Sequence, residues 1–517
     1  MKKLLLLSLA MVMACNATQN QTSKSNEEVV KGPTPYAMGI TEDELKTYLY
    51  TYASDEFEGR ETGTRGQKKA VEFLRSEYEK MGVPGGLPGG EYFQKVPLEI
   101  SRLPRGTLNI DGTEYEMGTD FLTFSPITGN FSEVVYAGYG VEDGNYSDYS
   151  GLDVKGKIVL IKAGEPMNED GTYKISGSNV SSVWSNLAES VEKKTQILVE
   201  KGARGILYFD NVNFRRYQRA FDFLANSDEQ RISLKDDGDP PALILLQDKA
   251  AMAVFPDIKQ ASEPRLLHIP MQFNIESTNE EIDSENVIAV VKGKTKPDEY
   301  LIISSHLDHI GISDDGKINN GADDDGSGSV AMLEIAEAFK QAAADGQGPD
   351  RTIVFLHVTG EEKGLLGSEY YTDVNPAFPL KGTVVDLNID MIGRTDPKRH
   401  GSDEYVYLIG SDKLSSELHR LSEEINKTYT QLELDYTYND DNDPNRFYYR
   451  SDHYNFAKNN IPIIFYFNGT HEDYHRPTDT PDKIRYDLLA KRARLIFYTA
   501  WELANRQERI VVDKVSK

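Results

Sequence analysis

The 517-residue sequence predicts an α/β fold with a second, smaller domain inserted into it. From residue 285 onward, short apolar segments alternate with helical segments, which is typical of α/β folds. Between residues 126 and 267 the pattern changes to short apolar strands among Gly- and Tyr-rich stretches. The chain is also longer than one ordinary core requires. These observations predict two domains: residues 36–125 with 268–510, and the insert 126–267.

The first residues have the pattern of an export signal. Two lysines precede the apolar run 4–14, and Cys15 follows it. The stretch from Val12 to Cys15 resembles a bacterial lipobox, whose cysteine becomes lipidated, although an ordinary secretory signal with an incidental cysteine is the alternative. After this signal peptide (1–15), residues 16–35 are polar and predict a tether. We therefore expect an exported lipoprotein, periplasmic or anchored to the outer membrane.

Composition limits the classes of partner. The net charge of −26 disfavours nucleic acid and charge-driven docking on anionic lipid. Cys15 is the only cysteine, so disulfides within the chain and cysteine-rich metal sites are excluded. No later apolar run approaches the roughly 20 residues that a membrane span requires. We expect no nucleic-acid partner and membrane contact only through an N-terminal lipid anchor; the oligomeric state stays open.

The elements on either side of the insert follow from capping and periodicity. Thr41 and Glu44 form a capping box that predicts a helix start, and residues 66–82 predict a second, amphipathic helix. A polar loop with three glycines, 54–66, lies between them. After the insert, a helix is predicted over 330–339. Strands are predicted at 287–291, 300–303, 352–357, 384–389, 405–409 and 461–466.

Candidate metal ligands stand at the ends of these elements. His306 and Asp308 end one predicted strand and, two residues apart, point to the same face. His306 could bind a metal while Asp308 accepts the other ring proton. Three adjacent carboxylates, Asp323 to Asp325, precede the helix at 330, and a cation would relieve their repulsion.

Further acidic groups and histidines extend this set. Glu361 and Glu362 follow another strand, and because adjacent side chains diverge, one could face a metal and the other a reacting water. Asp390 ends an apolar strand, where a carboxylate requires a counter-charge. His475 would complete a set of nitrogen and oxygen ligands suited to zinc. Three other histidines are alternatives to it: His471, His453 and His309.

Five segments together carry a family resemblance: SSHLDHIG (304–311), GADDDGSGS (321–329), TGEEKGLLGS (359–368), NIDMIG (388–393) and YHRPTDTPDKI (474–484). In this order they resemble the co-catalytic dizinc aminopeptidases, whose relatives include glutamate carboxypeptidase II and plasma glutamate carboxypeptidase. The resemblance covers 36–125 and 268–505. It implies a mixed, largely parallel sheet of about eight strands between helices. The insert resembles a protease-associated (PA) domain.

The resemblance also implies metal ligands. His306 and Asp390 would bind one zinc ion, Glu362 and His475 would bind the other, and Asp324 would bridge the two. The implied cofactor is therefore two Zn²⁺ per chain.

The remaining implied roles are catalytic. Glu361 would be the general base, Asp308 would orient His306, and Tyr474 would stabilise the oxyanion. The implied function is an exported aminopeptidase that acts on peptides.

Other functions remain open on the same residues. Carboxypeptidases and glutaminyl cyclases share this scaffold. A carboxypeptidase would need a cation near the site, for which there are four candidates: Arg394, Arg446, Arg450 and Arg476. A binding protein with an inactive peptidase domain is disfavoured because the base and all the expected ligands are present.

Overall fold

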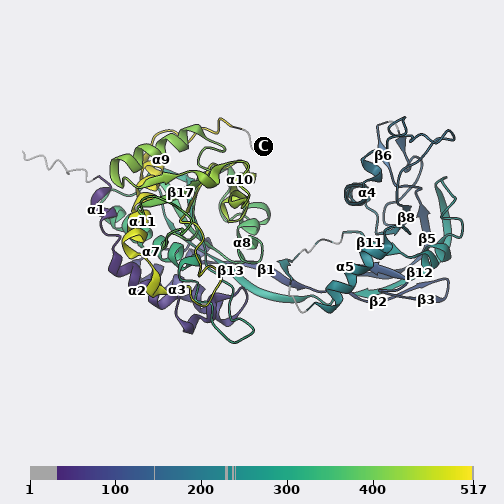
Figure 1. The fold of residues 1–517 in the computed structure, drawn as a ribbon, viewed down its shortest axis with the longest axis horizontal. Coiled ribbons are helices and arrows are strands. Elements are labelled where there is room, and N and C mark those ends of the chain that lie inside the picture. The colour runs from purple at the N-terminus through teal and green to yellow at the C-terminus, as the bar shows by residue number, and fades with distance from the viewer. Residues whose placement is uncertain (1–31, 145, 228–230, 236–237, 239, 515–517) are drawn as a thin grey trace, which may run out of the picture.

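In the computed structural model, the chain forms two lobes that are joined by long strands (Figure 1). The structure describes residues 32–514 except 145, 228–230, 236–237 and 239. The predicted signal peptide and lipobox lie outside the described residues, as does most of the tether. Within the described residues, no helix is both long enough and apolar enough to cross a membrane.

The larger lobe is built on a mixed sheet, which confirms the predicted fold class. Its central strands β15, β14, β16 and β19 are parallel to one another, and antiparallel strands flank them. Within the described residues the sheet has nine strands, in the order β10 (Arg231–Leu234), β1 (Phe93–Ser101), β13 (Glu280–Val291), β15 (Arg351–Val358), β14 (Lys296–His306), β16 (Thr383–Ile389), β19 (Ile463–Phe467), β17 (Tyr405–Ile409) and β18 (Glu433–Asp435).

Helices cover both faces of this sheet because the side chains of each strand alternate between two cores. On β14, Leu301 and Ile303 belong to one core, and Tyr300 and Ile302 belong to the other. The second core includes α10 (His453–Lys458) and the turn Tyr370–Val374 that follows α8 (Leu366–Glu369). The first core is covered by α1 (Thr34–Ala37), α2 (Glu42–Tyr52), α3 (Arg65–Met81), α7 (Gly328–Ala344), α9 (Ser416–Tyr429) and α11 (Tyr486–Asn505).

Both predicted N-terminal helices are present, and the second spans Arg65–Met81 where 66–82 was predicted. The Thr41 hydroxyl accepts a hydrogen bond from the Glu44 amide at 3.3 Å, and α2 starts directly after Thr41. α3 ends at Gly82, whose φ of 70° is left-handed and favours glycine. α2 and α3 therefore hold the loop 54–66 between them, against the sheet edge that carries the candidate ligands.

The smaller lobe has its own sheet, and its strands β5, β8, β9 and β11 are parallel. Among the residues described for this lobe there are three α-helices: α4 (Leu187–Glu200), α5 (Phe214–Asn226) and α6 (Asp248–Val254). Within the described residues the sheet has eight strands, in the order β3 (Thr113–Glu116), β2 (Arg105–Ile110), β12 (Arg265–Glu276), β5 (Ile127–Tyr136), β8 (Ile158–Lys162), β9 (Gly205–Phe209), β11 (Ala242–Leu246) and β4 (Phe121–Thr123).

The limits of the second sheet differ from the predicted limits of the insert. The sheet takes in strands from Arg105 to Glu276, whereas the insert is predicted over 126–267. The chain passes between the sheets from β1 to β2 and from β12 to β13, and the change in sequence pattern comes only after β2–β4. Strand membership thus favours wider limits, and the division into domains and the likeness to a PA domain stay predictions.

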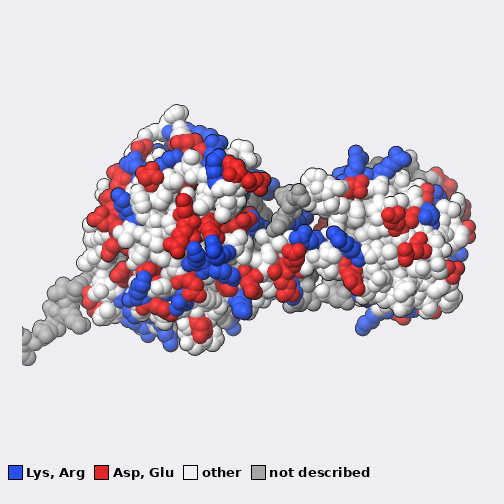
Figure 2. Space-filling model, turned by 90° about the horizontal axis from the view of Figure 1, so that it is seen from below, with Lys and Arg blue, Asp and Glu red and all other residues white. Residues whose placement is uncertain are grey.

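The surface carries charges of both signs. On the face drawn in Figure 2, Lys and Arg side chains lie among Asp and Glu side chains over both lobes. This mixed distribution accompanies a net charge of −26. The absence of a nucleic-acid partner stays a prediction.

Candidate metal centre

Three of the predicted ligands come from the carboxyl ends of neighbouring parallel strands. His306 is the last residue of β14, Asp390 directly follows β16, and Glu362 lies four residues after β15. Parallel strands end at the same edge of a sheet, where α/β proteins generally place their ligands. The parallel pairing of β14 with β15 and with β16 therefore brings the three side chains to one edge.

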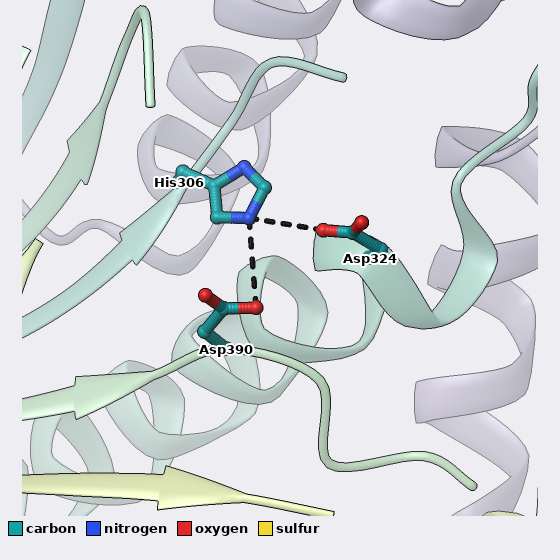
Figure 3. A group of neighbouring side chains, drawn as sticks. All are labelled: His306, Asp324 and Asp390. Carbon is teal, nitrogen blue, oxygen red and sulfur yellow. Dashed lines mark ion pairs between the residues drawn. The ribbon is translucent and has the colours of Figure 1, made fainter. Parts of the chain in front are cut away.

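His306, Asp324 and Asp390 form one group of ligand atoms, shown in Figure 3. The Nε2 atom of His306 lies 3.2 Å from Asp324 Oδ1 and 3.6 Å from Asp390 Oδ1. All three residues are buried. This arrangement of one imidazole and two carboxylates could hold a divalent cation.

Glu362 and His475 form a second group with the other oxygen of Asp324. His475 Nε2 lies 3.2 Å from Asp324 Oδ2 and 3.1 Å from Glu362 Oε2. Asp324 thus faces a histidine with each of its two oxygens, which is what a bridging ligand between two ions requires. The five residues predicted as metal ligands are brought together.

Four histidines are candidates for this position from the sequence alone: His309, His453, His471 and His475. His471 contacts Asp323 instead, at 3.2 Å, and His453 is bonded to the Tyr448 carbonyl at 2.8 Å. His309, however, lies in the site beside His475, with its Nδ1 atom 2.8 Å from Glu362 Oε1. The two imidazole rings are 5.7 Å apart and nearly perpendicular.

Several buried atoms of this cluster have no hydrogen-bond partner among the described residues: His306 Nε2, His309 Nδ1, Asp324 Oδ2 and Glu362 Oε1. Buried polar atoms in proteins are nearly always paired, so such a concentration requires an explanation. His309 Nδ1 faces the unpaired oxygens of Asp324 and Glu362, and His306 Nε2 faces the other oxygen of Asp324. A pair of divalent cations with nitrogen and oxygen ligands fits these atoms and would satisfy them.

The three consecutive aspartates have different roles, which sequence alone could not separate. Asp323 accepts a hydrogen bond from the Gly393 amide at 2.6 Å, and Asp325 accepts one from the Met391 amide at 3.0 Å. Both outer carboxylates therefore tie the loop to the segment that follows Asp390. The middle carboxylate, on Asp324, is the one that faces both His306 and His475.

Buried electrostatics favour the ionised form of this middle carboxylate. Burial raises the pKa of Asp324, but the neighbouring His306, His309 and His475 rings outweigh burial, so the pKa lies well below its usual range. For Asp325, burial dominates and raises the pKa well above its usual range.

Glu361 and Glu362 are adjacent but have opposite environments. Burial raises the pKa of Glu361 well above its usual range; the His306 ring opposes this rise, and Asp390 adds to it. Burial also acts to raise the pKa of Glu362, but the rings of His309 and His475 lower it to about 2. Two neighbouring acids whose pKa values diverge can serve as a proton acceptor and as a metal ligand.

The Glu361 side chain lines a small cavity of about 30 Å³ beside the ligand groups. Asp324, Asp390 and Tyr474 also line it, and the Tyr474 ring stacks on His475 at 3.9 Å. Cavities of about 440 and 1020 Å³ lie against the smaller sheet and the strands that join the lobes. Unpaired ligand atoms, rather than cavity volume, therefore identify the site.

Asp308 contacts His306 in a way that the sequence analysis did not foresee. The ring atom His306 Nδ1 lies 2.9 Å from the main-chain carbonyl oxygen of Asp308. The Asp308 carboxylate instead accepts hydrogen bonds from the Thr62 hydroxyl at 2.7 Å and the Glu361 amide at 3.2 Å. Asp308 thus orients the histidine through its backbone and holds the start of the glutamate pair through its side chain.

The loop 54–66 also supports the site, which its polar composition did not reveal. Arg60 is fully buried and donates to the carbonyl oxygens of Leu307, Asn320 and Gly321 at 3.2, 2.7 and 2.9 Å. It thereby links the segment after β14 to the segment before Asp324. A glycine-rich loop followed by a helix cap gave no signal that an arginine at position 60 would be buried.

The four arginines proposed for a substrate carboxylate are separated by their positions. Arg394 is held by Asp473 at 3.0 Å. Arg450 lines the small cavity together with Glu361, and its guanidinium packs over the Phe447 ring at 4.9 Å. Among the described residues, no carboxylate lies within ion-pair distance of Arg450. Arg446 packs on Tyr449, and neither it nor Arg476 lines this cavity.

The chain is similar to known proteins in sequence and in structure. Residues 286–500 match the model of Peptidase family M28. A "probable leucine aminopeptidase 2" of Aspergillus oryzae is 25% identical over 431 residues, which are 82% of this chain and 71% of that protein. A "probable zinc metalloprotease" of Pyricularia oryzae is 28% identical over 43% of this chain and 50% of its own length. A solved aminopeptidase from Aneurinibacillus sp. strain AM-1 superposes with a TM-score of 0.46 at 20% identity, covering 93% of this chain and 98% of that one.

Proposed function

We propose that the protein is a zinc-dependent aminopeptidase that uses two zinc ions per chain to remove N-terminal residues from peptides. The observation that carries this proposal is the set of unpaired buried ligand atoms on both sides of Asp324. The M28 family match and the relatives named as an aminopeptidase and a zinc metalloprotease support it.

The proposed ions have defined holders. His306 and Asp390 would hold one ion, Glu362 and His475 the other, and Asp324 would contact both. When bound, zinc supplies Lewis acidity that polarises a carbonyl group and lowers the pKa of a water molecule.

Two residues of the cavity perform the proton chemistry in this proposal. The Glu361 carboxylate accepts a proton from the attacking water and returns it to the nitrogen of the leaving amine. The Tyr474 hydroxyl donates a hydrogen bond to the carbonyl oxygen of the scissile bond as negative charge develops there. Burial raises the pKa of Tyr474 well above its usual range, so the phenol stays protonated and can donate.

Recognition of the N-terminus follows from charge. Three carboxylate residues, Asp324, Glu361 and Asp390, line the same small cavity. A free α-ammonium group would find opposite charge there, whereas an acetylated N-terminus has no charge to place. We therefore expect the enzyme to require a free N-terminus.

A carboxypeptidase is the second candidate, and Arg450 is the observation that favours it. Among the residues that the structure describes, this guanidinium has no ion-pair partner, and it lines the cavity as a group that awaits a substrate carboxylate would. The carboxylate could instead belong to the side chain of an acidic residue in an aminopeptidase substrate.

One assay separates these candidates. The zinc-loaded protein is given one peptide sequence in free, N-acetylated and C-amidated forms, with and without a chelator. Cleavage of the free and amidated forms, lost on acetylation and on chelation, is the expected result. Loss of cleavage on amidation rather than acetylation would establish the carboxypeptidase instead, and pyroglutamate formation from N-terminal glutamine would favour a glutaminyl cyclase.

Export and lipidation belong to the same proposal but rest on sequence alone. Metabolic labelling with a fatty acid in a bacterial host should label the wild-type protein and not the Cys15→Ser variant. Labelling of neither protein would leave only the ordinary secretory signal as an explanation of residues 1–15.

A further inference from the structure

His309 is fully buried at the junction of the two metal groups, and the five predicted ligands do not include it. Its backbone is fixed by a hydrogen bond from its amide to the Arg60 carbonyl at 3.3 Å and by a bridge to Glu61. The ring is therefore held in the site by the loop 54–66. Neither ring nitrogen has a hydrogen-bond partner among the described residues.

The Nδ1 atom of His309 faces two of the ligand residues. It lies 2.8 Å from Glu362 Oε1 and 3.8 Å from Asp324 Oδ2, and both oxygens are themselves unpaired. The approach to Glu362 is short but does not have the direction of an N–H···O hydrogen bond, since both atoms remain unpaired. His306 Nε2 faces its own two carboxylates in the same way.

His475 faces the same two carboxylates, with its Nε2 atom 3.2 Å from Asp324 Oδ2 and 3.1 Å from Glu362 Oε2. His309, Asp324 and Glu362 offer ligand atoms that all lie within 4.8 Å of one another, and His475 contacts the same two carboxylates. Two imidazoles and two carboxylates are the number and kind of ligands that a zinc ion takes in proteins. A single cation there would satisfy three buried atoms that have no other partner: His309 Nδ1, Asp324 Oδ2 and Glu362 Oε1.

We propose that His309 is a direct ligand, through Nδ1, of the ion held by Glu362 and His475. This inference rests on the proposed two-ion site. It makes the two ions unequal. One ion would have four protein ligands, two of which are imidazoles. The other would have three protein ligands, of which only His306 is an imidazole. The ion with the fuller set binds more tightly, and the ion beside His306 keeps more of its coordination sphere open for substrate.

The test counts imidazoles directly and requires no variant. The protein is stripped with a chelator, reloaded with two equivalents of zinc and examined by zinc X-ray absorption. The expected spectrum contains three imidazoles shared by two zinc ions. Two imidazoles per two ions would overturn the proposal and leave His309 outside the coordination sphere.

Variants then locate the additional imidazole. With one equivalent of zinc, His309→Ala and His475→Ala should each lose one imidazole from the spectrum, and His419→Ala should lose none, because His419 lies on α9 and contacts Ser411. Calorimetric titration should show the tight-site affinity of His309→Ala falling by at least about 100-fold, beyond the ~10–100-fold effect of an outer-sphere partner. An unchanged imidazole count in a folded His309→Ala protein would refute direct ligation.

Failure of this inference and failure of the proposed function are distinguishable. The spectra do not depend on peptide cleavage, so three imidazoles in a protein that cleaves no peptide would uphold the ligand assignment and refute the peptidase. Cleavage of free peptides by a protein with two imidazoles would do the reverse.

Discussion

The two sheets resemble each other in one respect and differ in a more informative one. Within the described residues, both contain a run of four neighbouring parallel strands, and both have charged side chains where those strands end. In the smaller sheet, Asp210 follows β9 and accepts from the amides of Val212 and Asn213 at 3.1 and 2.9 Å, and Lys162 on β8 donates to the Ala261 carbonyl at 2.5 Å.

In the larger sheet, the corresponding edge leaves buried atoms of His306, Asp324 and Glu362 unpaired. Charged residues at strand ends are therefore not sufficient to identify a functional site. The distinguishing feature is whether neighbouring loops already satisfy them. The following predictions test this difference.

The edge of the larger sheet, where ligand atoms have no hydrogen-bond partner among the described residues, is called the unpaired edge, and the corresponding edge of the smaller sheet is called the paired edge. The largest effect is expected for Glu361→Gln at the unpaired edge. The amide fills the same space but cannot accept the proton of water, so kcat should fall by about 10²–10⁴-fold. Zinc content and substrate binding should stay unchanged, as measured by elemental analysis and by the affinity for a non-hydrolysable peptide analogue. A variant with near wild-type turnover would show that another group is the base.

Glu362→Gln should have a different defect, although the two residues are adjacent. This carboxylate faces His475 at 3.1 Å, so its loss should weaken the binding of one ion. Activity should fall at stoichiometric zinc and recover in part when zinc is added in excess. Equal loss of metal in the Glu361 and Glu362 variants would contradict the division of roles.

How far the sequence could predict this site depends on the kind of interaction. The strands, the helix caps and the ligands at strand ends were predictable because they follow from local periodicity and from residue type. From the sequence, His309 was only an alternative ligand. Its ring is placed by the loop 54–66, which is more than 240 residues away in sequence. The hydrogen bond between Arg60 and Leu307 is one of the contacts between these two segments.

Other features could not be predicted because they are set by tertiary contacts between similar groups. Asp323, Asp324 and Asp325 are chemically identical, and only the amides of residues 391 and 393 select which two are structural. Likewise, the spacing of His306 and Asp308 indicated that they interact, but not that the main-chain carbonyl would be the acceptor.

Asp325→Ala should reduce stability at the unpaired edge without removing a ligand. It leaves the amides of Met391 and Gly328 without their acceptor, and each unsatisfied buried group costs about 1–3 kcal/mol. Denaturation of the chelator-treated protein should show this loss, and zinc affinity should also fall because Met391 follows Asp390. Unchanged stability would mean that water replaces the carboxylate.

Thr62→Val should have a smaller effect, through Asp308. The hydroxyl donates to Asp308 Oδ2 at 2.7 Å, and outer contacts of this kind affect metal affinity or activity by about 10–100-fold. We expect the lower end of that range, because the Glu361 amide still holds the carboxylate. Thr47→Val is the matched control, since that exposed hydroxyl bonds only to the Asp43 carbonyl on α2. An equal effect of both substitutions would show that the Thr62 hydroxyl does not support the metal site.

The smallest effect on activity is expected at the paired edge, for Asp210→Ala. Its carboxylate holds the turn before α5, and loss of such a contact costs about 0.5–2 kcal/mol of stability. The lower end is expected, because Val212 is 81% exposed and water can reach the freed amide. Chemical denaturation should detect this loss, while kcat/KM stays within about twofold of wild type. A tenfold loss of kcat/KM in a fully folded variant would show that the smaller lobe takes part in the reaction. Charged residues that are already paired at a sheet edge would then not be reliable signs of a purely structural role.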